Sequence, residues 1–198
     1  MTAPKPAMLL VCNKQVELLE SLRFGLRQAG YSCEVVEQTA EFDISVVIGR
    51  APVLLVVVID ALSDDVVAQL AELDNHSPCP VMLCVGQHNP ALLAKAIETG
   101  ASTYISGACS DERAALLAEL ATLRFQARQK LIHDVEDAKN KLKERKLVER
   151  AKGILMEKKQ LSEQDAYRVM RQAAMNRAQP LVQVAASVIQ VSELLNGS

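Results

Sequence analysis

The first 110 residues alternate short apolar runs with segments of helical periodicity. Val53–Ile59 is apolar at every position, as expected for a strand buried on both faces of a parallel sheet. Four further strands are predicted at Met8–Val11, Ser32–Val36, Pro80–Val85 and Ser102–Ile105. Helices are predicted at Val16–Ala29, Phe42–Ile48, Ser63–Leu73 and Asn89–Gly100, with Ser63 and Asn89 as N-caps. This alternation predicts an α/β fold with a doubly wound parallel sheet in flavodoxin-like order.

From Asp111 to about Lys159 the pattern is continuous helix, with no proline and a single glycine, Gly153. Apolar positions in its first part step by threes, fours and one seven, and they are Leu117, Leu120, Ala127, Leu131, Val135, Ala138 and Leu142. The stripe resembles a coiled-coil heptad interrupted by Arg124. It needs a partner helix, most simply from a second copy of the chain. The alternative is a helix folded back on its own domain.

Three short amphipathic helices are predicted at the C-terminal end. The first has one apolar face formed by Leu147, Val148, Ala151, Ile154 and Leu155. Ser162–Asp165 is a capping box that opens the second. Pro180 helps to start the third, whose apolar face holds Leu181, Val184, Ala185, Val188 and Ile189. The predicted domains are an α/β domain over residues 1–109, a linking coiled-coil helix over 110–146 and a three-helix domain over 147–198.

Charge divides the chain into two parts of opposite sign. Residues 1–123 hold 7 basic and 15 acidic side chains, a formal charge of −8, whereas residues 124–198 hold 15 and 9, a formal charge of +6. A basic C-terminal part indicates a polyanionic partner, and the acidic part suits a regulatory module. Aromatic residues make up 3% of the chain, which argues against base stacking as the main mode of binding.

The sequence predicts no cofactor and no metal site. The five cysteines form no CxxC pair and the three histidines are scattered, so neither zinc spacing nor a disulfide framework is present. The turn Cys12–Gln15 lacks a glycine-rich phosphate loop. Scattered thiols suit a reducing compartment, and no signal segment or bilayer-length apolar run is visible, so we expect a cytoplasmic protein without membrane contact.

Asp60 follows the third predicted strand, where two-component receivers place their phosphoacceptor, and residues 8–123 resemble such a receiver. Phosphoryl transfer to a carboxylate needs acidic groups that hold a divalent cation, together with hydroxyl and ammonium donors. Other residue types occupy those positions: Asn13 and Lys14 for the acidic pair, Val85 and Gly86 for the hydroxyl, and Gly107 for the lysine. We therefore expect a pseudo-receiver in which Asp60 is a vestigial phosphoacceptor position.

A more specific resemblance covers residues 149–195. Four segments occur in the order of one family: AKGILM (151–156), AY (166–167), MRQAAM (170–175) and LVQVA (181–185). They resemble the ANTAR domain, the RNA-binding module of AmiR- and NasT-type antitermination regulators, and the NasT type, which controls nitrate assimilation, is the nearest in appearance.

The resemblance implies a non-enzymatic regulator that binds stem-loops in nascent leader mRNA and favours the antiterminated transcript. It also implies a homodimer formed through the long helix. Control by phosphorylation is not expected, so an inhibitory sensor protein would take its place. In NasT-type relatives this partner is a nitrate-sensing binding protein.

The residue types support a binding face on the second C-terminal helix. Ala166, Val169, Met170 and Ala173 share a side suited to packing, whereas Tyr167, Arg171, Ala174, Met175 and Ala178 share another. Arginine can contact phosphate or stack on a base, and tyrosine can stack as well. The predicted RNA-binding residues are Arg150, Lys152, Met156, Tyr167, Arg168, Arg171, Met175 and Arg177. For the lone arginines a solvated charge, and for the methionines simple packing, remain the alternatives.

The alternative function is that of a DNA-binding two-component response regulator with a helix-turn-helix. Against it, the link Arg177–Pro180 has no glycine for a tight turn, and residues 181–195 contain no Lys or Arg to present to a DNA groove. An enzyme that uses Asp60 would lack a convergent site.

Overall fold

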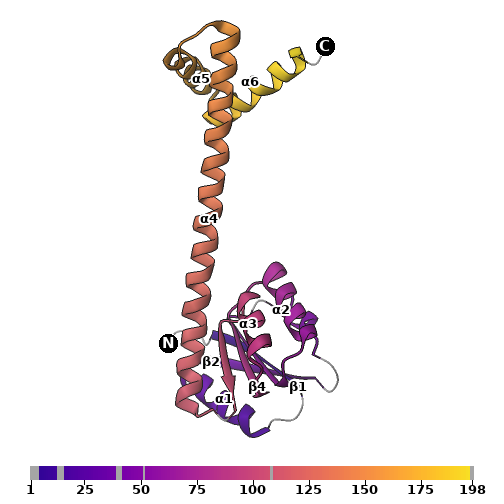
Figure 1. Cartoon of the computed structure of the whole chain (residues 1–198). Coiled ribbons are helices and arrows are strands. Elements are labelled where there is room, and N and C mark those ends of the chain that lie inside the picture. The colour runs from indigo at the N-terminus through magenta and orange to yellow at the C-terminus, as the bar shows by residue number, and fades with distance from the viewer. Residues whose placement is uncertain (1–4, 13–15, 39–41, 51, 108, 197–198) are drawn as a thin grey trace. The chain divides into compact units, whose positions relative to one another are not determined.

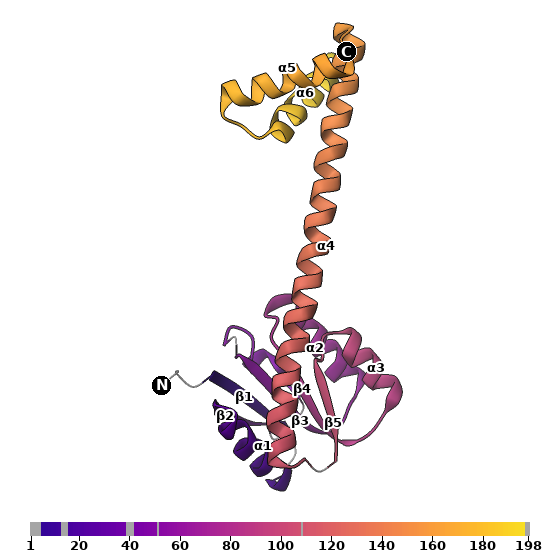
Figure 2. The same ribbon diagram turned by 90° about the vertical axis from the view of Figure 1, so that its left-hand side faces the viewer.

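The computed structural model describes residues 5–12, 16–38, 42–50, 52–107 and 109–196, which fall into two compact units, Met1–Gln129 and Lys130–Ser198. The strands are β1 (Lys5–Cys12), β2 (Tyr31–Gln38), β3 (Leu54–Ala61), β4 (Val81–Gln87) and β5 (Thr103–Ser106). The helices are α1 (Val16–Gln28), the 3₁₀ turn η1 (Ile44–Val46), α2 (Asp64–His76), α3 (Pro90–Glu98), α4 (Asp111–Lys159), α5 (Glu163–Arg177) and α6 (Leu181–Asn196). Figure 1 shows these elements along the chain, and the strands are all labelled in Figure 2.

The five strands of the first unit form one parallel sheet in the order β2-β1-β3-β4-β5. Leu54 of β3 pairs with Ala7 of β1, and Leu55 pairs with Val81 of β4. This is the flavodoxin-like order that the sequence predicts, so the predicted fold class is confirmed.

Helices cover both faces of this sheet (Figure 2). Along β3, the side chains of Leu54, Val56 and Val58 pack with α1 and the start of α4. Those of Leu55, Val57 and Ile59 pack with α2 and α3 on the opposite face. All six are at most 3% exposed, which explains why this strand is apolar at every position.

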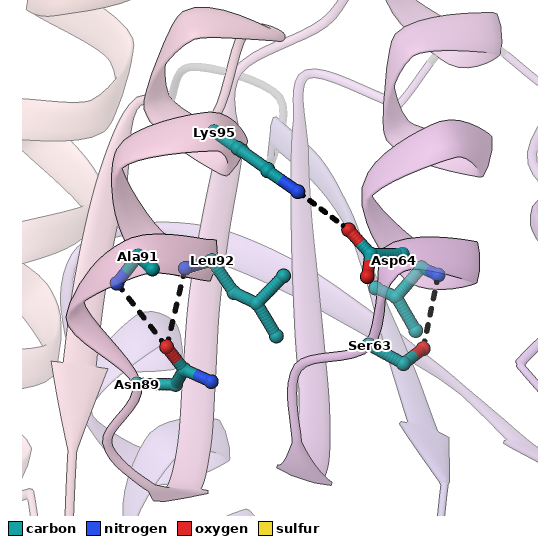
Figure 3. A network of polar contacts seen from close by, with 7 residues as sticks. Ser63, Asp64, Asn89, Ala91, Leu92 and Lys95 are labelled. Carbon is teal, nitrogen blue, oxygen red and sulfur yellow. Dashed lines mark hydrogen bonds and ion pairs between the residues drawn. The ribbon is translucent and has the colours of Figure 1, made fainter.

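The predicted N-caps of two helices are confirmed. The Ser63 hydroxyl accepts a hydrogen bond from the Val66 backbone N–H at the start of α2. The Asn89 side chain accepts from Ala91 and Leu92 at the start of α3, as Figure 3 shows. Each cap satisfies backbone donors that lack partners within the helix.

The helix predicted over Phe42–Ile48 is wrong, because only the 3₁₀ turn η1 forms there. Its β-branched residues disfavour the helix interior, and the side chain of Asp43 caps the turn by accepting from the Ser45 N–H. The side chain of Gln69 in α2 also forms hydrogen bonds with backbone groups of this segment, in place of the bonds that a helix would form. Its amide oxygen accepts from the Ile44 N–H at 2.9 Å, and its amide nitrogen donates to the Phe42 carbonyl at 2.7 Å.

The first part of α4 packs on the sheet of its own unit. Ala114, Ala118 and Ala121 are fully buried there at helical spacing. Gly25 of α1 makes this approach possible, since a Cβ at that position would lie 2.1 Å from the Asp111 carbonyl oxygen. For this part of α4, the alternative of a helix packed on its own domain is the observed one.

In the second unit, the end of α4 packs with α5 and α6 around one core. Its buried residues are Ala151, Met170, Ala174, Val184, Ala185 and Ile189. The predicted apolar faces of the first and third helices are confirmed, because their remaining members pack against this core. Gln160 and Ala178, both with φ near 50°, end α4 and α5 without a glycine.

The predicted core side of α5 is wrong in two positions. Val169 is 48% exposed, whereas Ala174, assigned to the binding side, is buried. At about 100° per residue, Ala166, Met170 and Ala174 advance in steps of about 40° along one arc. The buried arc therefore extends toward Ala174, which leaves Val169 outside it.

No helix in the described part of the chain is both long enough and apolar enough to cross a bilayer.

Candidate nucleic-acid interface

An exposed face of α5 carries the residues with the clearest predicted contacts to RNA. Tyr167 is 43% exposed and Met175 67% exposed, and the Arg171 side chain between them is exposed as well. These three lie beside the buried arc of the helix and are not part of the core. A ring, a guanidinium and a thioether are thus available to solvent on successive turns of one helix.

The arginines of α5 differ in their partners. Arg168 donates to the Asp165 carboxylate one turn earlier. Arg171 and Arg177 are exposed, and within the described residues neither forms an ion pair. An anionic ligand would have to compete with the Asp165 carboxylate at Arg168, but it would meet no such carboxylate at Arg171 or Arg177.

Lys152 lies in a different environment from the other candidate residues. It is 8% exposed, and its ammonium lies 2.8 Å from the Glu149 carboxylate and 2.7 Å from that of Glu163. Hydrogen bonds to Glu149 and then to Glu163 raise the pKa of Lys152, and the bond from Lys152 lowers the pKa of Glu163. The pair joins α4 to the start of α5, which favours a structural role for Lys152.

Arg150 and Met156 lie on the same section of α4. Arg150 forms a 2.7 Å ion pair with Glu193 of α6, with both side chains exposed, so the pair adds little stability. Met156 is 39% exposed. Both side chains remain accessible to a ligand.

Two basic residues outside the predicted set, Lys158 and Lys159, lie at a groove in the second unit. The groove has a volume of about 330 Å³, and its mainly apolar wall includes Ile154, Leu155 and Val188. Lys158, Lys159 and Arg177 also line it. The position of the two lysines could be predicted from the sequence, because residues i and i+4 share a helix face. Lys158 and Lys159 follow Ile154 and Leu155 by four residues, so they lie beside this apolar wall.

At the other candidate site, Asp60 lies exposed at the end of β3. Nearby, Lys95 of α3 forms a 2.7 Å ion pair with Asp64 of α2, as Figure 3 shows. Val85, which is buried, and Gly86 offer no hydroxyl, and Gly107 offers no ammonium, while Asn13 and Lys14 lie outside the described residues. These residue types do not fit the Mg²⁺ site of a phosphorylated receiver.

Comparison with known proteins identifies the C-terminal part. Residues 136–189 match the ANTAR domain. The chain carries an ANTAR domain. The transcriptional regulatory protein PdtaR of Mycobacterium tuberculosis is 27% identical over 190 residues, which cover 95% of this chain and 92% of PdtaR. The nitrate regulatory protein of Klebsiella oxytoca is 35% identical over 77 residues, which cover 38% of this chain and 19% of that protein.

The first unit has the fold of signal receiver domains. The receiver domain of an HD domain-containing protein from Pseudomonas fluorescens aligns with a TM-score of 0.52 and 20% identity, covering 66% of this chain and 95% of that one. The receiver domain of a modulated diguanylate cyclase from Desulfovibrio desulfuricans aligns with a TM-score of 0.50 and 17% identity. The alignment covers 63% of this chain and 98% of that one. At these identities the similarity concerns the fold alone.

Together, the ANTAR domain and the two regulators support the interpretation of the chain as an RNA-binding antitermination regulator. They point to a regulatory protein.

Proposed function

We propose that the protein is a transcription antiterminator that binds stem-loops in nascent leader mRNA through the exposed face of α5. The observation that carries the proposal is the ANTAR match, within which Tyr167, Arg171 and Met175 are exposed together on one helix. Arg177, at the end of α5, adds a further positive charge and lines the C-terminal groove together with Lys158 and Lys159. Arg150, Met156 and Arg168 are secondary contacts of this surface.

RNA loops offer the chemistry that such a face can bind. Loop bases are unstacked and can lie against an aromatic ring or a guanidinium plane, while the phosphates attract positive charge. Tyr167 supplies the ring, and Arg171 supplies either a stacking plane or a phosphate contact. Lys152 acts on this face indirectly, by holding the start of α5 against α4.

The targets of regulation are leader transcripts of nitrate and nitrite assimilation genes. The similarity to a nitrate regulatory protein supports this assignment. An inhibitory sensor protein, by resemblance a nitrate-sensing binding protein, controls the chain in place of phosphorylation. The protein acts in the cytoplasm, where nascent transcripts are made.

A homodimer through the long helix completes the proposal. Leu131, Val135 and Leu142 are each at least 50% exposed along α4, and a second copy of the helix would cover them. Dimerisation would present two RNA-binding faces to one transcript, and avidity would then raise the overall affinity.

The test is a titration of leader stem-loop RNA with the full chain at fixed salt. Arg171→Ala and Tyr167→Ala should each weaken binding by about 1–3 kcal/mol, through loss of a charge-assisted contact and of stacking. Both variants should fold, because neither side chain belongs to the core. Circular dichroism melts check this point.

Two control variants test whether the loss of an exposed charge elsewhere changes the RNA affinity. Arg113→Ala removes an exposed arginine from the first unit and should leave the affinity unchanged. Glu157→Ala removes an exposed negative charge and should leave the affinity unchanged or slightly higher. Equal affinity of the wild type, Arg171→Ala and Tyr167→Ala would show that this face is not the RNA site. Tighter binding to the same sequence as duplex DNA would favour a DNA-binding response regulator.

A further inference from the structure

The first unit contains a groove along the outer edge of its sheet, lined by residues of α3, the edge strand β5, the turn between them and the first part of α4. Figure 2 shows where these elements lie. Its volume is about 480 Å³. We call it the β5-edge groove. Its apolar walls are formed by Ile97, Leu117, Leu120 and Phe125, and its polar groups include Thr103 and Arg124.

The size and lining of the β5-edge groove suit a small organic ligand. Sites for such ligands measure about 300–1,000 Å³ and combine apolar walls with a few convergent polar groups. Ile97 is 56% exposed, so a bound apolar group would remove it from water. The apolar walls alone would not select a ligand, and the polar groups provide that selection.

Thr103 supplies the first of these groups. The residue is 5% exposed, and within the described part of the chain its hydroxyl oxygen has no hydrogen-bond partner. A buried hydroxyl without a partner is costly, because burial removes its bonds to water. A ligand acceptor in the groove would satisfy it.

Two arginines line the groove and differ in what they bind. Arg128 is committed, since its two terminal nitrogens lie 2.8 and 2.6 Å from the two carboxylate oxygens of Asp74. Gly100, with φ at +118°, leaves room for this pair, because a Cβ there would lie 2.9 Å from both Arg128 and Asp74. Asp74, which lies outside the lining, therefore holds Arg128 as a fixed part of the groove wall.

Arg124 keeps donors for a ligand. Among the described residues its hydrogen bonding consists of one long contact, 3.4 Å from a terminal nitrogen to the Ser102 carbonyl oxygen. The residues that line the groove include no carboxylate, so nothing in the lining competes with an anion for this guanidinium.

We propose that the β5-edge groove binds a small carboxylate with an apolar body. Arg124 donates hydrogen bonds to the carboxylate, and the Thr103 hydroxyl donates a hydrogen bond to an oxygen of the same ligand. The apolar part of the ligand is enclosed by Leu117, Leu120 and Phe125. This ligand site lies in the receiver-like unit and is independent of the RNA-binding face on α5.

Calorimetric titration of the full chain with phenylbutyrate tests the proposal, with phenylbutanol as the uncharged counterpart. We expect one site per chain and a preference of about tenfold for the carboxylate. Arg124→Gln should abolish that preference, and Thr103→Val, which keeps the side-chain shape, should weaken binding several-fold. Leu120→Trp should block the groove. Arg113→Gln, an exposed arginine on α4 outside the groove, should bind as the wild type does.

Three outcomes would overturn the proposal. The first is absence of binding, or equal affinity for the carboxylate and the alcohol. The second is binding that Arg124→Gln, Thr103→Val and Leu120→Trp all leave unchanged while the variants are folded, because the ligand would then occupy another site. The third is a change of oligomeric mass caused by Leu120→Trp without ligand, which would make the groove a contact between copies of the chain.

Discussion

Lys152 and Glu163 hold two helices of the ANTAR domain together, and their ionisation limits the pH range of that contact. The folded-state pKa of Glu163 lies below its ordinary value of 4.5, so its contribution to stability is present above that value and is lost as pH falls through the folded pKa. The pKa of Lys152 lies above 10.5, so its contribution is present below that value and is lost as pH rises through the folded pKa. Both ionised groups therefore contribute fully to stability between about pH 4.5 and pH 10.5.

Lys152→Met and Glu163→Gln should therefore flatten the acidic fall in stability of the helical unit. We expect melting temperatures measured by circular dichroism between pH 6 and pH 3 to decline less steeply in both variants than in the wild type. Lys143→Met, which removes an exposed lysine of α4, is the matched control and should decline as the wild type does. Identical slopes in all four proteins would show that the pair does not contribute.

Two glycines in helices predict opposite effects of the same substitution. Gly25→Ala should lower the free energy of unfolding by about 1–3 kcal/mol, because its Cβ would meet the Asp111 backbone. Gly153→Ala should raise it by about 0.5–1 kcal/mol, since no atom within 4 Å would obstruct the methyl group and alanine favours helix. Urea denaturation measures both. An unchanged midpoint for Gly25→Ala would contradict the close approach of α1 and α4.

At the scale of elements, α4 meets three kinds of surroundings along its length. Ala114, Ala118 and Ala121 are buried against the sheet, and Ala151 is buried in the helical core. Between these parts every described residue from 130 to 146 is exposed. The stripe available to a second chain is therefore shorter than the sequence suggested, because Leu117 packs within the first unit.

Leu131→Lys with Leu142→Lys should convert a dimer to a monomer, since two charges would be placed in the seam between the helices. Sedimentation velocity of the full chain measures the mass. His133→Lys with Asn140→Lys adds lysines at exposed positions about 200° around the same helix and should leave the dimer intact. The same mass for the wild type and the Leu131/Leu142 variant would contradict the proposed pairing.

The elements show which features the sequence could predict. Apolar periodicity placed the five strands, and cap residues such as Ser63 and Asn89 placed helix starts, because these signals are local. The prediction of a helix over Phe42–Ile48 was wrong because Gln69, which is distant in the sequence, forms hydrogen bonds with that backbone. The role of Lys152 was missed for a related reason, since Glu163 belongs to another helix. Local patterns do not contain the partners that tertiary packing supplies.

At the scale of the whole molecule, the formal charge of −8 over residues 1–123 and +6 over 124–198 divides the chain into an acidic and a basic part. The basic part contains the ANTAR domain, and the acidic part has the receiver fold. An acidic unit repels nucleic acid, so RNA is expected to engage the C-terminal residues alone. The proposed control by a sensor protein in place of phosphorylation would need to act through the first unit or on the RNA-binding face itself.

Asp60 allows a direct test of whether phosphorylation is the signal. Val85 and Gly86 stand where the hydroxyl is expected, and Gly107 stands where the lysine is expected. None of them offers a hydroxyl or an ammonium to stabilise a transferring phosphoryl group. Incubation of the full chain with acetyl phosphate and Mg²⁺ should therefore leave its mass unchanged by intact-protein mass spectrometry. The affinity for leader stem-loop RNA should stay equal before and after this treatment, and Asp60→Asn should bind RNA as the wild type does. An added phosphoryl mass that Asp60→Asn abolishes would show that the receiver-like unit is chemically active, and an accompanying change in RNA affinity would make phosphorylation the signal.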